Sequence, residues 1–272
     1  MTETFDAAWL ALREDVDHRS RAAELLPPLR KWWSAGERSA VLDLGCGTGS
    51  NLRYLAPKLA GPQTWTVVDH DAGLLARVES PDGDVRVTPL RGDLAGAGLA
   101  EVGGAHLVTA SALLDLVSES WLNAAVDACA DARCGALFAL SYDGAIEWSG
   151  AADPLDALVC RSVNDHQRRD KGLGPALGPA AGRAAEELFR RRGFRTWLLP
   201  SAWRLGPSDV TLARALLEGW ATATAEQRPA EAGSVRAWSE RRQTCLARGD
   251  LELVVGHQDL LALPTDPMQD RS

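Results

Sequence analysis

A short glycine-rich stretch that begins with an acid is the most chemically informative part of the chain. Asp43 is followed by glycines at alternate positions, Gly45, Gly47 and Gly49. Alternate glycines form a turn without Cβ atoms, so the backbone can approach a ligand closely. Helical spacing resumes at once from Asn51, which would place that ligand beside a helix N-terminus. The pattern predicts a nucleotide-binding unit made of a strand, a glycine turn and a helix.

The glycine spacing separates the nucleotide classes. A dinucleotide loop needs Gly-x-Gly-x-x-Gly, but here Gly49 comes one residue early and Ser50 occupies the last position. A phosphate-binding P-loop is excluded because no Gly-Lys-Ser/Thr follows. An acid two residues before Gly-x-Gly-x-Gly resembles motif I of the class I S-adenosylmethionine-dependent methyltransferases. The resemblance implies that S-adenosyl-L-methionine is the cofactor.

Further acids follow the next predicted strands. Asp69 ends the strand 63–69, where a carboxylate can accept hydrogen bonds from both ribose hydroxyls. His70 could lie against the adenine or be a solvated turn residue. Asp93 resembles the family's adenine contact, together with Leu94; the alternative is an acid that caps the next short helix.

The methionine half of the cofactor is expected at the end of the fourth strand, where Ala110 and Ser111 resemble the family's lining segment. Cys46 in the glycine loop is expected to contribute only its small size. The predicted cofactor-binding residues are therefore Asp43, Gly45, Cys46, Gly47, Gly49, Asn51, Asp69, His70, Asp93, Leu94, Ala110 and Ser111.

A general base is needed only if the acceptor must lose a proton. His166 is the first candidate, because histidine has a suitable pKa and the stretch 148–181 lacks a clean period and is interpreted as a loop. The alternative is a histidine that merely tethers the loop. Tyr142 and Asp115 are the next candidates, and Asp115 lies just beyond Ser111, near the expected acceptor. No metal is expected, since no Asp-Asn pair accompanies the acids that end strands.

Strands alternate with helices along the chain, which predicts an α/β fold: a three-layer Rossmann-like arrangement with a mostly parallel, seven-stranded sheet. The predicted division is an N-terminal helical segment at 1–38, a methyltransferase domain at 39–264 and a tail at 265–272. A helical insert at 207–249 precedes the last strand. The N-terminal segment is either a pair of helices packed on the sheet edge or a lid, with Arg13, His18 and Arg19 facing inwards.

Composition limits the partners. A net charge of -8 and a pI near 5.2 argue against a broad nucleic-acid surface. Five scattered cysteines without a Cys-x-x-Cys pair, an N-terminus without an apolar core and no long apolar run favour a cytoplasmic protein without a membrane partner.

The sequence therefore predicts a methyltransferase acting on a small-molecule acceptor such as a secondary metabolite, with a homodimer as one option. Two alternatives stay open: a protein of this fold that binds the cofactor without methyl transfer, and a nicotinamide-dependent oxidoreductase.

Overall fold

The computed structural model describes residues 6–265. One sheet organises them, with the strand order β3-β2-β1-β4-β5-β8-β6 and with β7 paired to β8. The strands are β1 (Ala40–Leu44), β2 (Gln63–Asp69), β3 (Val85–Arg91), β4 (Leu107–Ser111), β5 (Gly135–Trp148), β6 (Phe194–Pro200), β7 (Trp203–Leu205) and β8 (Leu253–Pro264). The first five strands pair in parallel, whereas β8 is antiparallel to β5, β6 and β7. The predicted mostly parallel, Rossmann-like α/β sheet is confirmed, with β7 as one strand more than expected.

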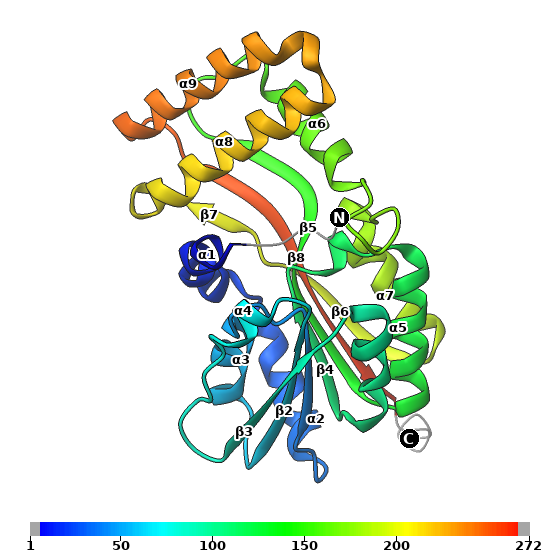
Figure 1. Ribbon diagram of the computed structural model, residues 1–272. Helices are drawn as coiled ribbons and strands as arrows, with labels where there is room; N and C mark the ends of the chain where they lie inside the picture. Colours follow the sequence, from blue (N-terminus) through cyan, green and yellow to red (C-terminus); the bar gives the residue numbers. More distant parts are fainter. Residues whose placement is uncertain (1–5, 266–272) are drawn as a thin grey trace.

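Residues 6–265 contain nine α-helices, some packed about the sheet and others beyond it (Figure 1). They are α1 (Ala7–Ser20), α2 (Leu26–Ser34), α3 (Ser50–Leu55), α4 (Ala72–Leu75), α5 (Glu119–Ala132), α6 (Asp156–Gln167), α7 (Ala181–Arg191), α8 (Val210–Gln227) and α9 (Ala232–Arg248). None of these helices combines the length and the apolar character that crossing a bilayer requires.

Two apolar clusters form the layers on either face of the sheet. On one face, Trp33 of α2 and Leu52 of α3 pack in a cluster with Trp65 of β2. On the other, Val126 of α5 and Phe189 of α7 pack in a cluster that includes strand residues. Strands covered on both faces must be apolar along their length, which explains the nearly continuous apolar run of β1. The buried exception in that strand, Asp43, is therefore informative.

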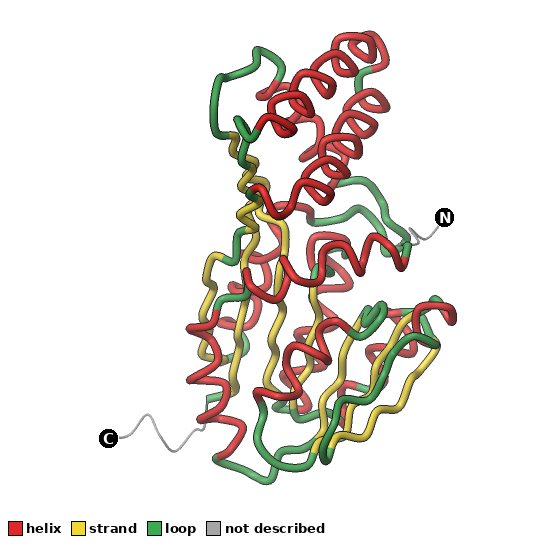
Figure 2. The backbone as a smooth tube through the Cα atoms, turned by 90° about the vertical axis from the view of Figure 1, so that its left-hand side faces the viewer, coloured by secondary structure: helices red, strands yellow, loops and turns green. Residues whose placement is uncertain are grey.

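A third cluster builds a helical lobe beyond the sheet. Strands β5 and β8 continue past the parallel strands and, with β7, connect to α6, α8 and α9 (Figures 1 and 2). Trp148 at the end of β5 packs edge-on against Trp220 and Trp238, with ring centroids 5.3 and 5.5 Å apart. The far end of β5 and the start of β8 carry core residues of this lobe, among them Ile146, Leu253 and Val255.

The interpretation of 148–181 as a loop is wrong for its middle part, which forms α6. Val159 and Val163 lie one turn apart and are buried against the lobe. The polar run that follows them masked this short apolar stripe. The predicted helical insert corresponds to α8 and α9, whereas residues 266–272 of the predicted tail lie outside the described residues.

Helix α1 lies between the sheet and the helical lobe (Figure 1) and contacts β7 and α8. Helix α2 instead packs on the sheet through Leu29 and Trp33.

Candidate functional site

A cavity of about 250 Å³ opens at the carboxyl ends of β1, β2 and β4, the edge at which open α/β sheets bind ligands. The glycine loop forms one side of it, and Leu10, Arg13 and Asp17 of α1 lie on another. Nine of the predicted cofactor residues line it: Gly45, Cys46, Gly47, Asn51, Asp69, His70, Asp93, Leu94 and Ser111. The sheet therefore gathers segments far apart in the sequence into one site.

The backbone of the glycine loop has the shape that the sequence predicts. Gly45, Gly47 and Gly49 have φ of +65°, +54° and +83°, values that side chains rarely adopt. A Cβ added at Gly47 would lie 3.0 Å from Cδ1 of Leu10 on α1. Because Leu10 also lines the cavity, a side chain at Gly47 would fill the space between loop and helix. The loop thus forms a cradle for a ligand.

Asp69 connects the end of β2 to this loop. Its Oδ2 accepts a hydrogen bond from the Gly47 N–H at 2.9 Å, and its Oδ1 accepts one from the Asp71 N–H at 3.0 Å. Each carboxylate oxygen has a second lone pair, so hydroxyl donors can still bind there. His70, whose side chain is 42% exposed, lies beside Asp69 with Nδ1 3.4 Å from Oδ1.

Asp93 has the capping role that the sequence left open. Its Oδ1 accepts a hydrogen bond from the Gly96 N–H at 2.5 Å, at the start of the short turn 94–98. Asp93 and Leu94 also line the cavity, so capping the turn and facing the ligand are compatible.

Asp43 lies beneath the cavity and does not line it. It is fully buried, and its Oδ1 accepts a hydrogen bond from Asn51 Nδ2 at 2.7 Å. The same amide group donates to Thr109 Oγ1 at 3.0 Å, so two strands orient the Asn51 side chain. Burial raises the pKa of Asp43 to about 7, and its Oδ2 has no protein partner. Asp43 thus positions a residue that faces the ligand.

Of three other predicted cofactor residues, only one lines the cavity. Gly49 and Ala110 are not among the residues that line the cavity. Cys46 does line it, and burial raises the pKa of its thiol well above the ordinary value, so no thiolate nucleophile is available there.

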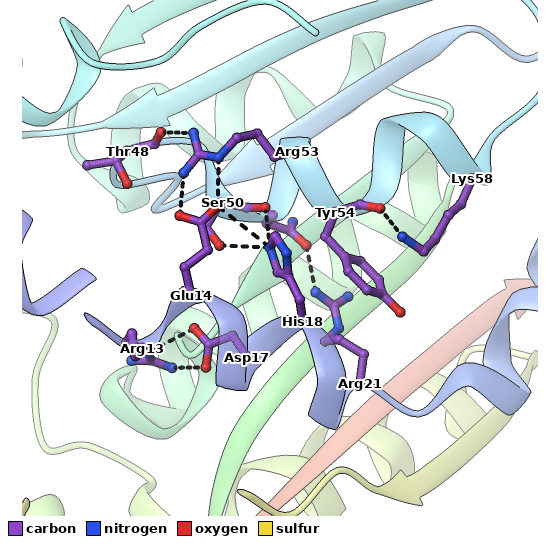
Figure 3. A network of polar contacts seen from close by, with 11 residues as sticks. Arg13, Glu14, Asp17, His18, Arg21, Thr48, Ser50, Arg53, Tyr54 and Lys58 are labelled. Carbon is purple, nitrogen blue, oxygen red and sulfur yellow. Dashed lines mark hydrogen bonds and ion pairs between the residues drawn. The ribbon is translucent and has the colours of Figure 1, made fainter. Parts of the chain in front are cut away.

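Helix α1 is fastened to the loop by a polar network that Figure 3 shows. Arg53 donates to both carboxylate oxygens of Glu14, at 2.7 and 2.6 Å, and to the Thr48 carbonyl at 2.6 Å. His18 Nε2 lies 3.0 Å from the carbonyl oxygen of Ser50 and 3.1 Å from its hydroxyl. These contacts seat α1 over the glycine loop.

The three inward-facing residues predicted for α1 separate in the structure. Arg13 lines the cavity and forms an ion pair with Asp17, whereas His18 contacts the loop. Arg19 forms an ion pair with Asp209 at 2.7 Å and does not line the cavity.

A buried arginine extends this network under the site. Arg21 donates to Asn51 Oδ1 at 2.9 Å and to Asp259 Oδ2 at 3.2 Å. The N–H groups of Ala22 and Leu140 also donate to Asp259, at 3.0 and 2.7 Å. Sequence analysis missed Arg21 and Asp259, because 238 residues separate them and no local pattern marks either one.

A second cavity, of about 170 Å³, adjoins the first, and both are lined by Arg13, Ala112 and Leu116. It lies between α1, the strands β5, β7 and β8, and the helical lobe. Two of the predicted candidate bases, Asp115 and Tyr142, line it. The Tyr142 hydroxyl donates to Asn164 Oδ1 at 2.8 Å, and burial raises its pKa, so the hydroxyl keeps its proton and is not available as a base.

His166, the first candidate base, lines neither cavity. It lies on α6, and its Nε2 is 3.5 Å from the carboxylate of Glu226 on α8. The sequence interpretation placed His166 in a loop that folds back over the sheet. The segment is instead helical, and this helix carries His166 away from both cavities.

The family comparison concerns the first half of the sheet. Residues 41–133, from β1 to the end of α5, match the family model described as a methyltransferase domain. The matched segment contains the glycine loop, Asp69 and Asp93. No curated protein matches the chain.

Three solved structures to which the chain is similar all have TM-scores below 0.5. Phosphoethanolamine N-methyltransferase 2 from Haemonchus contortus, in complex with S-adenosyl-L-methionine, is 12% identical with a TM-score of 0.43; the match covers 90% of this chain and 53% of that one. A methyltransferase from Geobacter sulfurreducens, in complex with S-adenosyl-L-homocysteine, is 17% identical with a TM-score of 0.44, over 97% and 100% of the two chains. A cyclopropane synthase from Mycobacterium tuberculosis is 11% identical with a TM-score of 0.42, over 96% and 100%. The chain spans about half the length of the Haemonchus protein, and similarities this low assign neither a ligand nor a reaction to it.

Proposed function

We propose that this chain, which belongs to the class I S-adenosylmethionine-dependent methyltransferases through its domain at residues 41–133, transfers a methyl group from S-adenosyl-L-methionine to a small-molecule acceptor. The observation that carries the proposal is that two cavities lie side by side under α1 and share Arg13, Ala112 and Leu116 in their walls. One is lined by the glycine loop and Asp69, and the other lies against the helical lobe.

The residues of the first cavity fit the cofactor. The bare backbone at Gly45 and Gly47 leaves room for the methionine portion, and Ser111 would lie along it. The Asp69 carboxylate would accept hydrogen bonds from the ribose hydroxyls. Asp93 and Leu94 would face the adenine, with His70 at the exposed rim.

The order of the strands in the sheet also bears on the alternative function, a nicotinamide-dependent oxidoreductase. Dinucleotide-binding sheets commonly have the order 3-2-1-4-5-6. Here β8 lies antiparallel between β5 and β6. Together with the shifted third glycine, this order disfavours a nicotinamide cofactor.

S-adenosyl-L-methionine supplies a methyl group on a positively charged sulfur, which is already a strong electrophile. The chain therefore has to hold two molecules in line and exclude water. Helix α1 would do both, because Leu10 and Arg13 face the first cavity and Arg13 with Trp9 faces the second. The Glu14–Arg53 ion pair and the His18–Ser50 contact keep the helix in this position.

The small size of the second cavity supports a small-molecule acceptor. Its volume is about 170 Å³, and helices α1 and α8 and the ribbon of β5, β7 and β8 contribute to its walls. The net charge of -8 supports the same choice against a nucleic-acid substrate.

The proposal is tested by incubating the full chain with S-adenosyl-L-methionine and a panel of small hydroxyl and amine compounds. Mass spectrometry should detect S-adenosyl-L-homocysteine and a product heavier by one methylene unit. The Gly47→Val variant should form neither. Cofactor binding without either product for every acceptor tried would favour the alternative of a binding protein.

A further inference from the structure

The second cavity contains a buried carboxylate that the fold leaves incompletely bonded. Asp115 lies on the short helical turn Leu114–Leu116, just after β4, and is only 6% exposed. Its Oδ1 has no hydrogen-bond partner in the protein. A buried acceptor without a donor costs free energy, so a ligand that supplies a donor hydrogen would bind favourably there.

A second orphaned polar atom belongs to the same cavity. Trp203 on β7 is 3% exposed, and its Nε1–H donor has no partner. One missing donor and one missing acceptor are complementary to a hydroxyl group, which both donates and accepts. An aromatic amine offers donors but only a weak acceptor, so it would satisfy Asp115 alone.

The walls favour a flat ring. Trp203 lies against His257 with ring centroids 4.7 Å apart, and Tyr142 packs edge-on with the same imidazole, with centroids 6.1 Å apart. Trp9 and Trp220 complete the aromatic lining. A cavity of about 150 Å³ in another protein holds one benzene molecule, so the present volume of about 170 Å³ suits a single substituted ring.

The charges around Asp115 come from several elements. Arg13 on α1 and Lys171 in the loop after α6 both lower its pKa, as do the backbone N–H groups of Asp115 and Tyr142. Burial outweighs them and raises the pKa of Asp115 to about 6. Near neutral pH the carboxylate is therefore ionised and can accept a proton.

The other charged and titratable groups do not favour an organic cation. Arg13 is itself a cation in the cavity wall, paired with Asp17 and placed over the Trp203 ring at 4.8 Å. Burial lowers the pKa of His257 to about 3, so its ring is neutral. A neutral acceptor fits these surroundings better than an ammonium group.

The backbone beside the cavity is held in an unusual conformation. Among residues 6–265, three non-glycine residues have positive φ, and two of them, Ala112 and Leu140, line this cavity with φ of +53° each. Strained residues of this kind cluster at functional sites, because the surrounding structure must hold them in place.

We infer that the second cavity binds a single-ring phenol whose hydroxyl donates to Asp115 Oδ1 and accepts from Trp203 Nε1, and that Asp115 removes the phenolic proton during methyl transfer. The inference rests on the proposed methyltransferase function. The acceptor's oxygen lone pair forms the new bond to the methyl carbon while the carbon–sulfur bond of S-adenosyl-L-methionine breaks, and that electron pair stays on sulfur. The proton passes to Asp115 and then to water. A phenol suits this base better than an aliphatic alcohol, because its pKa of about 10 makes it the stronger acid.

Calorimetric titration of phenol, anisole and aniline into the full chain without cofactor tests the binding step. Anisole has the same ring without a donor hydrogen, and aniline replaces O–H with N–H. Phenol should bind about tenfold more tightly than anisole, as expected for one hydrogen bond to a charged group, and more tightly than aniline. Equal affinities for phenol and anisole, or aniline binding as tightly as phenol, would overturn the inference.

Two variants test whether Asp115 Oδ1 and Trp203 Nε1 cause the difference in affinity between phenol and anisole. Asp115→Asn removes the carboxylate charge at nearly constant shape, and Trp203→Phe removes the indole N–H together with part of the ring. Each should reduce the preference for phenol over anisole severalfold, because each weakens a hydrogen bond to the phenol hydroxyl. Asp165→Asn, which alters an exposed carboxylate on α6, is the matched control and should change neither ligand. If phenol kept its advantage in both cavity variants, the assignment would be wrong.

Adding S-adenosyl-L-homocysteine separates this inference from the proposed function. Phenol affinity should not fall when that ligand is bound, since the two occupy different cavities; competition would place phenol in the first cavity and overturn the inference. If the protein binds phenol more tightly than anisole and aniline but does not bind S-adenosyl-L-homocysteine, the phenol site stands and the cofactor assignment fails.

Discussion

Arg53 on α3 donates to both carboxylate oxygens of Glu14 on α1, at 2.7 and 2.6 Å, and so ties the helix over the cavity to the helix that follows the glycine loop. The two side chains are 34% and 21% exposed, so the pair is partly shielded from water. The hydrogen bond from Arg53 lowers the pKa of Glu14 below its ordinary value. Closure of the cavity therefore depends on an ion pair that also titrates.

Breaking this pair should loosen α1 without unfolding the chain. Glu14→Gln is expected to speed hydrogen exchange in α1 and to weaken S-adenosyl-L-homocysteine about two- to fivefold, the effect of losing up to about 1 kcal/mol. Glu187→Gln on α7 removes an exposed pair with Arg191 and serves as the control. Equal exchange rates in wild type and Glu14→Gln would show that the pair does not hold the helix.

Lowering the pH should loosen α1 in the wild type, as the Glu14→Gln substitution does. Because the pKa of Glu14 is lowered in the folded protein, its stabilising contribution is present above the unfolded pKa and is lost as the pH falls through the folded value. The exchange difference between wild type and Glu14→Gln should accordingly vanish at low pH.

A side chain at Gly47 should prevent cofactor binding, and a second glycine with positive φ separates the effect of the close contact from that of the backbone. Gly47→Val places a Cβ 3.0 Å from Leu10 Cδ1 and at positive φ, so it should abolish cofactor binding. Gly61 also has positive φ, +80°, but an added Cβ would meet nothing within 4 Å. Gly61→Val should therefore lower stability without affecting the cofactor, as measured by calorimetry and circular dichroism. Tight binding by Gly47→Val would mean that the loop does not hold the ligand.

The buried acid beneath the loop makes stability depend on pH. The pKa of Asp43 is raised to about 7, so the folded state holds a proton that the unfolded chain has already released, and this group's contribution to stability falls as the pH rises from about 4 to 7. Asp43→Asn removes that slope. Urea unfolding at pH 5 and pH 7 should show wild type losing about 1–3 kcal/mol relative to Asp43→Asn, from at most about 1.4 kcal/mol per pH unit.

Asp131→Asn makes the same substitution at an exposed position on α5 and serves as the matched control. A constant difference between wild type and Asp43→Asn would show that Asp43 titrates as an ordinary surface acid.

The proton-accepting role of Asp115 should appear in the rate profile. With phenol as acceptor, kcat/KM should fall as the pH drops through about 6, because protonated Asp115 cannot accept a proton. Asp115→Asn should lower kcat by roughly 10²–10⁴-fold and remove this acidic limb. An unchanged limb in the variant would assign it to another group.

The sequence predicted the site where function depends on local pattern. Gly45, Gly47 and Asp69 could be placed because a glycine spacing and a strand-ending acid are readable within a few residues. Parallel strands then bring their carboxyl ends to the same edge.

What was missed depends on contacts between distant segments. Asp259 on β8 and Arg21 after α1 form one buried pair, yet neither lies in a motif. The second cavity is assembled from α1, β5, β7, β8 and the lobe, and β7 is too short to predict. His166 was favoured as a base because its polar neighbours obscured the apolar positions Val159 and Val163 that make α6 a helix.

Calorimetric titration of S-adenosyl-L-homocysteine into wild type and Asp69→Ala tests the central claim most directly. The carboxylate of Asp69 lines the cavity and is bonded to Gly47 and Asp71 only through their backbone N–H groups, so removing it should leave the fold intact. Wild type should bind, and Asp69→Ala should lose about 1.5–3 kcal/mol for each hydrogen bond from a ribose hydroxyl to the charged carboxylate. No binding by wild type, or equal affinity in the two proteins, would contradict the assignment of this cavity to the cofactor.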